Sequence, residues 1–194
     1  MKLAIMKYNA GNTASVVNCV RRFGVEPDVT DDPEILSSAD KVIFPGVGEA
    51  SSAMMYLEEK GLDLVIRSLT NPVLGICLGM QVMCATSEEN STSCLNVIGA
   101  QVKRFPRSAL KVPHIGWNSV QIGNSALFNG VRSGEYFYFV HGYYVEKGGY
   151  TTATCNYGRE FSAAFERENF FGVQFHPERS GKAGEIIMEN FLNL

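Results

Sequence analysis

Apolar and polar residues along the first half of the chain predict strands and helices in alternation. Four short, mostly apolar runs are expected to form strands: Lys2–Tyr8, Val25–Val29, Asp40–Phe44 and Val73–Ile76. Helical spacing predicts helices over Thr13–Phe23 (N-capped by Asn12 or Thr13), Ala50–Leu69 (broken near Gly61) and Met80–Thr86. This order indicates a parallel sheet with helices on both faces.

The second half of the chain has the pattern of strands joined by turns rich in Gly and Asn. The expected strands are Val97–Phe105, Ser119–Ile122, Tyr136–Val145, Thr151–Cys155, Ser162–Phe165 and Phe170–Phe175, and Gly184–Leu194 is expected to form a closing helix. We therefore predict a single α/β domain over residues 1–194. Its sheet is open and mostly parallel, with helices on both faces and an antiparallel extension.

Composition and charge narrow the class of protein. Hydrophobic residues make up 45% of the chain and charged residues 19%, which is typical of a globular domain and not of a disordered one. The net charge of −3 argues against nucleic acid as the main partner. No apolar run approaches the roughly 18 residues of a membrane span, and the early lysines, Lys2 and Lys7, do not fit a signal peptide. Five cysteines without a Cys-x-x-Cys pair favour free thiols and a cytoplasmic location.

The most informative segment is Gly75-Ile76-Cys77-Leu78-Gly79-Met80-Gln81, where an apolar strand meets a helix. Gly-x-Cys-x-Gly is the nucleophile-elbow pattern with Cys in place of Ser. The two glycines permit a strained turn that lifts the thiol above the sheet. A helix N-terminus beside the sulphur favours the thiolate. Cys77 is therefore the candidate nucleophile, and the backbone N–H of Leu78 is a candidate oxyanion donor.

A thiol nucleophile needs a base, and His176 is the strongest candidate among the three histidines. In Val173-Gln174-Phe175-His176-Pro177-Glu178 an alternating strand ends at His176, and Glu178 can orient the imidazole. His114 and His141 are expected to have packing or partner roles, and the spacing of the three histidines implies no metal. Of the other cysteines, Cys19 and Cys84 are expected in the core, Cys94 in a loop and Cys155 at a strand end; none is a candidate nucleophile.

These two segments resemble the class I (triad) glutamine amidotransferases, which hydrolyse the glutamine amide and pass ammonia to a synthase. Further segments resemble the imidazole glycerol phosphate synthase branch of this family, and the resemblance spans nearly the whole chain. They are Tyr8–Asn12, Pro45-Gly46-Val47-Gly48, Pro113-His114-Ile115-Gly116-Trp117-Asn118, Tyr138-Phe139-Val140-His141 and His176–Ser180. The resemblance implies a flavodoxin-like fold, glutaminase activity without a cofactor in histidine biosynthesis, and a heterodimer with a (β/α)₈ cyclase subunit.

The resemblance also implies a role for each matching residue. Cys77, His176 and Glu178 would be the triad, and the N–H groups of Val47 and Leu78 the oxyanion hole. The residues expected to hold glutamine are Gly48, Gln81 and Glu89. The residues expected at the partner interface and the ammonia passage are Asn12, Trp117, Tyr138 and Arg179.

The segment Pro45-Gly46-Val47-Gly48 suggests a gate. Two glycines flank Val47, so its peptide can turn over at little steric cost and present either an N–H or a carbonyl to the oxyanion. We expect the isolated chain to be nearly inactive as a glutaminase, and the docked partner to favour the active orientation.

Some positions depart from the family pattern and leave alternatives open. Arg179 stands where Lys is usual, Gly142 where Ser or Thr is usual, Asn9-Ala10 replaces a loop that carries Gly or Pro, and Asn90–Leu95 lacks a Gly-rich turn. One alternative is a related glutaminase that serves another synthase, for example in surface-sugar amidination. The others are a Cys-His hydrolase of γ-glutamyl peptides and an inactive regulatory relative. A loose group of basic residues is interpreted as a solvated face and not as a docking site. It consists of Lys103, Arg104, Arg107 and Lys111.

Overall fold

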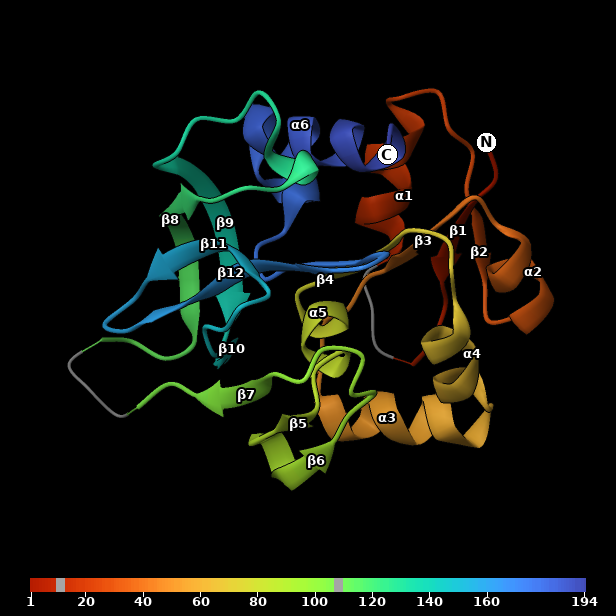
Figure 1. Cartoon of the computed structure of the whole chain (residues 1–194), viewed down its shortest axis with the longest axis horizontal. Coiled ribbons are helices and arrows are strands. Elements are labelled where there is room, and N and C mark those ends of the chain that lie inside the picture. Colours follow the sequence, from red (N-terminus) through yellow and green to blue (C-terminus); the bar gives the residue numbers. More distant parts are fainter. Residues whose placement is uncertain (10–12, 107–109) are drawn as a thin grey trace.

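The computed structural model describes residues 1–9, 13–106 and 110–194. Within these residues thirteen strands form one mixed sheet, shown in Figure 1, and helices cover both faces of its parallel half. The predicted α/β architecture with an antiparallel extension is therefore confirmed. No helix of the described part is long and apolar enough to cross a membrane.

The parallel half of the sheet contains strands from both the beginning and the end of the chain. Its strands, in spatial order, are β2 (Asp28–Thr30), β1 (Leu3–Met6), β3 (Lys41–Phe44), β4 (Val73–Ile76) and β13 (Phe170–Val173), and all neighbours are parallel. All but the edge strand β2 are fully buried, as near-continuous apolar runs require. Because Ile76 pairs with Val173, the residues that follow β4 and β13 leave the same edge of the sheet.

Helices from separate parts of the chain pack on the two faces of this sheet (Figure 1). One face is covered by α1 (Thr13–Arg21) and α6 (Gly181–Leu192), whose buried residues join one core cluster. The second core cluster includes residues of α2 (Pro33–Ser38), α3 (Ala50–Glu59), α4 (Leu62–Ser68) and α5 (Leu78–Val82). Each core is a helix layer packed on one side of the same strands.

The antiparallel extension starts at β12 (Glu160–Arg167), which pairs with β13. Two branches leave β12. One consists of β10 (Tyr143–Val145), β7 (Gln101–Arg104), β5 (Thr86–Ser87) and β6 (Thr92–Ser93); the other consists of β11 (Thr151–Asn156), β8 (His114–Ile122) and β9 (Glu135–His141). Three short 3₁₀ helices complete the fold: η1 (Glu89–Ser91), η2 (Ala126–Phe128) and η3 (Pro177–Arg179).

Several expected elements have different bounds in the structure. The helix expected over Met80–Thr86 ends at Val82, because the backbone from Ala85 onward bonds to Ala100 and joins β5. The closing helix begins three residues early, at Gly181. Position 184 therefore lies inside the helix, and it is a glycine because a side chain there would overlap the Pro177 carbonyl.

Other differences lie in the strands. The strand expected over Val25–Val29 is displaced to Asp28–Thr30, and β8 begins five residues before Ser119. Gly142 divides the strand expected over Tyr136–Val145 into β9 and β10. The helix α2 was not expected, although Asp32 caps it through its side chain. The break near Gly61 is confirmed, with a φ of +67° that suits glycine.

Candidate active site

Cys77 occupies a strained turn between β4 and α5. Its φ of 53° and ψ of −106° are unusual for a residue with a side chain, and its N–H is fixed by the Val173 carbonyl at 2.8 Å. Position 79 has to be glycine because a Cβ there would overlap the Phe44 carbonyl. Position 75 has to be glycine because a Cβ there would overlap the backbone of α5. The predicted elbow is therefore present, and it places the thiol at the carboxyl end of β4.

His176 and Glu178 lie beside this turn, at the end of β13. The imidazole Nδ1 lies 2.9 Å from Glu178 Oε1, and both side chains are nearly inaccessible to solvent. Burial lowers the pKa of His176, but hydrogen bonds to Cys77 and Glu178, together with their negative charges, outweigh it and raise the pKa to about 10. The structure thus brings Cys77, His176 and Glu178 together in the order that thiolate–imidazolium–carboxylate chemistry requires.

Two cavities flank the triad. The larger, of about 470 Å³, contains Cys77 and all the residues expected to form the oxyanion hole or hold glutamine. It is lined by Val47, Gly48, Cys77, Leu78, Gln81, Glu89, Arg104, Val112, Pro113, Val140, His141, Gly142 and Tyr143. The smaller, of about 80 Å³, contains His176, Glu178 and Arg179. Val47 and Val140 line both cavities, so they stand between them.

Polar groups of the larger cavity are held by hydrogen bonds. Gln81 Nε2 donates to the Tyr143 carbonyl at 3.0 Å and to Gln174 Oε1 at 2.8 Å. Glu89 Oε2 accepts the N–H of Ala50 at 2.7 Å. Burial raises the pKa of Glu89, although the Ala50 hydrogen bond partly opposes it. The carboxylate is thus a half-buried negative group with a cation as its natural ligand.

A carbonyl group of the loop from Pro45 to Gly48 accepts the hydrogen bond of one expected oxyanion donor, the Leu78 N–H. Leu78 N–H donates to the Gly46 carbonyl at 3.3 Å, and the Tyr8 hydroxyl donates to the Pro45 carbonyl at 2.6 Å. A side chain at Gly46 would overlap Tyr8 and Leu78, which explains the glycine. In this conformation the loop directs a carbonyl, and not an N–H, toward Leu78.

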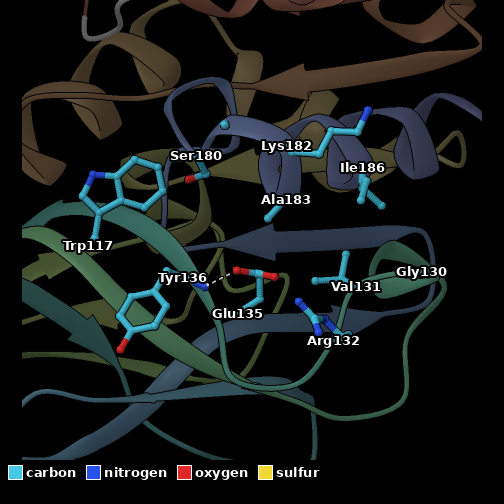
Figure 2. A pocket seen from close by; sticks show the side chains of 11 residues that line it. Trp117, Gly130, Val131, Arg132, Glu135, Tyr136, Ser180, Lys182, Ala183 and Ile186 are labelled. Atoms are coloured by element: carbon cyan, nitrogen blue, oxygen red, sulfur yellow. Dashed lines mark hydrogen bonds between the residues drawn. The ribbon is translucent and has the colours of Figure 1, made fainter.

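Three of the residues expected at a partner interface, Trp117, Tyr138 and Arg179, belong to the described part of the structure. The Tyr138 carbonyl accepts the N–H of His176 at 2.9 Å. Trp117 of β8 is 54% exposed and meets the Tyr138 ring of β9 edge-on at 6.0 Å. Arg179 lines the small cavity itself. A third cavity, of about 430 Å³, lies between residues 130–136 and the start of α6, with Trp117 at one side (Figure 2). Asn12 lies outside the described residues.

His114 and His141 have packing roles, as expected. The His114 ring stacks on Tyr157 with centroids 3.9 Å apart, and His114 Nδ1 lies 3.1 Å from His141 Nε2. His141 Nδ1 donates to the Tyr143 carbonyl at 2.7 Å. Burial lowers the pKa to about 4 for His114 and about 3 for His141, so both rings are neutral near pH 7. All five cysteines are free and buried, which agrees with the predicted absence of disulfides.

Two residues of the site were not singled out from the sequence. Arg104 belongs to the basic group interpreted as a solvated face, yet it lines the larger cavity, because β7 pairs with β10 beside it. Of the same group, Lys103 pairs with Glu88 and Arg107 is not among the described residues. Gln174 is fully buried, and its Nε2 donates to Cys77 Sγ at 3.5 Å. Its place two residues before His176 is the only sequence signal that could have found it.

Comparisons with known proteins agree with this geometry. Residues 5–194 match the family described as "Glutamine amidotransferase class-I". The chain is 54% identical to the imidazole glycerol phosphate synthase subunit HisH of Bacteroides fragilis and 46% identical to that of Escherichia coli, covering all of each protein. Among solved structures, a glutamine amidotransferase (TM-score 0.77, 16% identity, 100% of this chain and 98% of that one) and PurLQS from Thermotoga maritima (0.72, 19%, 99% and 97%) share the fold.

Proposed function

The chain belongs to the class I glutamine amidotransferase family, and we propose that it is the glutaminase subunit of imidazole glycerol phosphate synthase. Full-length identity of 46–54% to subunits of that name supports the assignment. The observation that carries the activity is the meeting of Cys77, His176 and Glu178 at the ends of neighbouring parallel strands.

The proposed reaction is hydrolysis of the glutamine side-chain amide through a thioester. The Cys77 thiolate attacks the amide carbon, and His176 protonates the leaving ammonia. His176 then takes a proton from water, which attacks the thioester and releases glutamate and the thiolate. Glu178 holds the imidazole and stabilises its charged form. N–H groups of Leu78 and Val47 would stabilise the oxyanion of both steps.

The larger cavity offers complementary charges to the amino-acid end of glutamine. Glu89 is suited to the α-ammonium group, and the carbonyl oxygen of the Gln81 amide, whose NH₂ group donates to Tyr143 and Gln174, is a second acceptor for it. Arg104 carries the positive charge among the lining residues and is suited to the α-carboxylate. With both charged ends held, the side-chain amide of glutamine extends toward Cys77.

The partner would be a (β/α)₈ cyclase subunit that receives ammonia. His176 and Arg179 line the small cavity, and the exposed Trp117 contacts the ring of Tyr138, whose carbonyl accepts the N–H of His176. Ammonia is mostly protonated in water near pH 7 and is then a poor nucleophile, so a protected passage suits the chemistry. The Leu78–Gly46 hydrogen bond supports the proposed gate, because it must break before Leu78 can stabilise an oxyanion.

The nucleophile is tested by Cys77→Ala in the complex with the cyclase. Glutamine-dependent turnover should disappear, while turnover supported by ammonium salt should persist because the cyclase site is separate. Cys84→Ala, a change at another buried thiol, is the matched control and should leave both activities unchanged. A diazoketone analogue of glutamine should label Cys77. Glutamine-dependent turnover by Cys77→Ala would refute the assignment.

The gate is tested by glutaminase rates of the chain alone, with the cyclase, and with the cyclase and its substrate. The rates should rise in that order. One missing oxyanion donor lowers kcat about 100- to 1,000-fold, so the first step should be of that size. A lone chain that already hydrolyses glutamine at the full rate of the complex would rule out the gate and favour a stand-alone hydrolase.

A further inference from the structure

A buried chain of two amides connects the wall of the larger cavity to the nucleophile. It runs from the Tyr143 carbonyl to Gln81 Nε2 at 3.0 Å, and then to Gln174 Oε1 at 2.8 Å. From there Gln174 Nε2 reaches Cys77 Sγ at 3.5 Å. Gln174 is fully buried in the segment between β13 and His176, and Gln81 is 5% exposed on α5.

The chemistry of the first acceptor sets the direction of the whole chain. A backbone carbonyl only accepts hydrogen bonds, so the Gln81 group that faces Tyr143 has to be its NH₂. The second N–H of that group then requires an acceptor, which makes the near atom of Gln174 its oxygen. The Gln174 NH₂ is left to face the sulphur. Reversing either amide would oppose like groups in a buried site, which is costly.

We propose that Gln174 is a positioning residue that orients the Gln81 amide for substrate and donates an N–H to the Cys77 thiolate. The inference rests on the proposed nucleophilic role of Cys77. Both Gln81 protons are used within the protein, so its oxygen remains for the α-ammonium group of glutamine. The donor on Gln174 favours the charged form of the sulphur, because hydrogen bonds to an anion are stronger than those to a neutral thiol. One side chain thus supports both substrate binding and nucleophile activation.

Several other groups act on this sulphur, and of these only His176 belongs to the segment that carries Gln174. The thiol also reaches the Val140 carbonyl of β9 at 3.7 Å. His176 is paired with Glu178, and its interaction with Cys77 raises the pKa of the imidazole. The Tyr8 hydroxyl donates to the Pro45 carbonyl, and burial together with the negative charge of Cys77 raises the pKa of Tyr8, so that it stays neutral. Glu89 and Arg104 are the charged groups that line the same cavity.

The first test is the rate at which iodoacetamide alkylates Cys77 across pH 5–10 in the isolated full chain, measured by peptide mass spectrometry. Gln174→Met keeps a long unbranched side chain but removes both polar groups. We expect alkylation at neutral pH to be about tenfold slower than in the native chain. Gln121→Met, the same change on the exposed surface of β8, is the control and should leave the profile unchanged. Thermal unfolding checks that each variant is folded.

The second test separates the two roles by kinetics in the complex with the cyclase. Gln174→Glu has the volume of the native residue and still accepts from Gln81, but it replaces the N–H that faces the sulphur with a carboxylate oxygen, which opposes the thiolate. It should lower kcat about tenfold with little change in KM, whereas Gln174→Met should also raise KM. Either folded variant with a native alkylation profile would overturn the inference while leaving the proposed function intact. A native chain in which Cys77 is alkylated no faster than Cys84 would instead refute the proposed function.

Discussion

Replacing Glu178 with Gln tests the electrostatic core of the proposed mechanism. The change keeps the size of the side chain and a possible acceptor for His176 Nδ1, now 2.9 Å from Oε1. It removes the negative charge that favours imidazolium. Glu178 Oε2 is buried and has no hydrogen-bond partner within the described residues, so the carboxylate charge is offset mainly by His176. An NH₂ group placed there would find no acceptor.

The expected loss can be worked out from this geometry. Opposite charges about 4 Å apart attract by about 4 kcal/mol at an effective dielectric constant of about 20. A neutral hydrogen bond to the new amide oxygen returns about 1 kcal/mol. The remaining ~3 kcal/mol corresponds to about two units in the pKa of His176 and about 100-fold in the thiolate–imidazolium population. His176→Ala removes proton transfer altogether and should cost about 10⁴-fold.

The assay is glutamine hydrolysis by the complex, combined with NMR titration of the imidazole in the isolated chain. Glu178→Gln should lower kcat about 100-fold and lower the pKa of His176, with KM for glutamine nearly unchanged. Glu189→Gln, the same change on the exposed surface of α6, is the control and should not change the His176 titration. A kcat within threefold of native, or a loss equal to that of His176→Ala, would refute the assigned role of Glu178.

Three further outcomes are expected. Arg104→Met should raise KM for glutamine about tenfold with kcat nearly native, measured by steady-state glutaminase kinetics; an unchanged KM would remove Arg104 from the substrate site. Gly142→Ser should lower that KM about threefold, because a Cβ there comes no nearer than 4.0 Å to Pro113 or Val112 and the hydroxyl usual in the family is restored. The free energy of unfolding should fall as pH rises from about 6.5 to 10. The pKa of His176 in the folded chain lies above its ordinary value, so the protonated imidazole stabilises the fold fully below pH 6.5 and loses this effect by about pH 10. Calorimetric unfolding of the native chain and of Cys77→Ala, in which this dependence should be weaker, checks the sign.

The sequence predicted those features that arise from local chemistry. Gly75 and Gly79 around Cys77 indicated the elbow, because a strained strand-to-helix turn needs residues without side chains at both places. The apolar run Val73–Ile76 predicted β4 with the bounds observed, since a strand buried on both faces is apolar throughout. The pattern that ends at His176-Pro177 predicted the last parallel strand, although β13 ends at Val173, two residues before the expected end. The same local patterns yielded the triad candidates Cys77, His176 and Glu178.

Only the tertiary structure decided which distant residues share the site. The pairing of β4 with β13 sets the separation of Cys77 and His176, which are 99 positions apart along the chain. The pairing of β7 with β10 brings Arg104 to the cavity, although its local pattern predicts a solvated cation. The role inferred for Gln174 depends on which atom of each neighbouring amide faces it, and that follows from the Tyr143 carbonyl on another strand. Residue patterns encode which face of an element is buried, whereas hydrogen-bond direction and charge pairing arise only when strands distant in sequence are packed together.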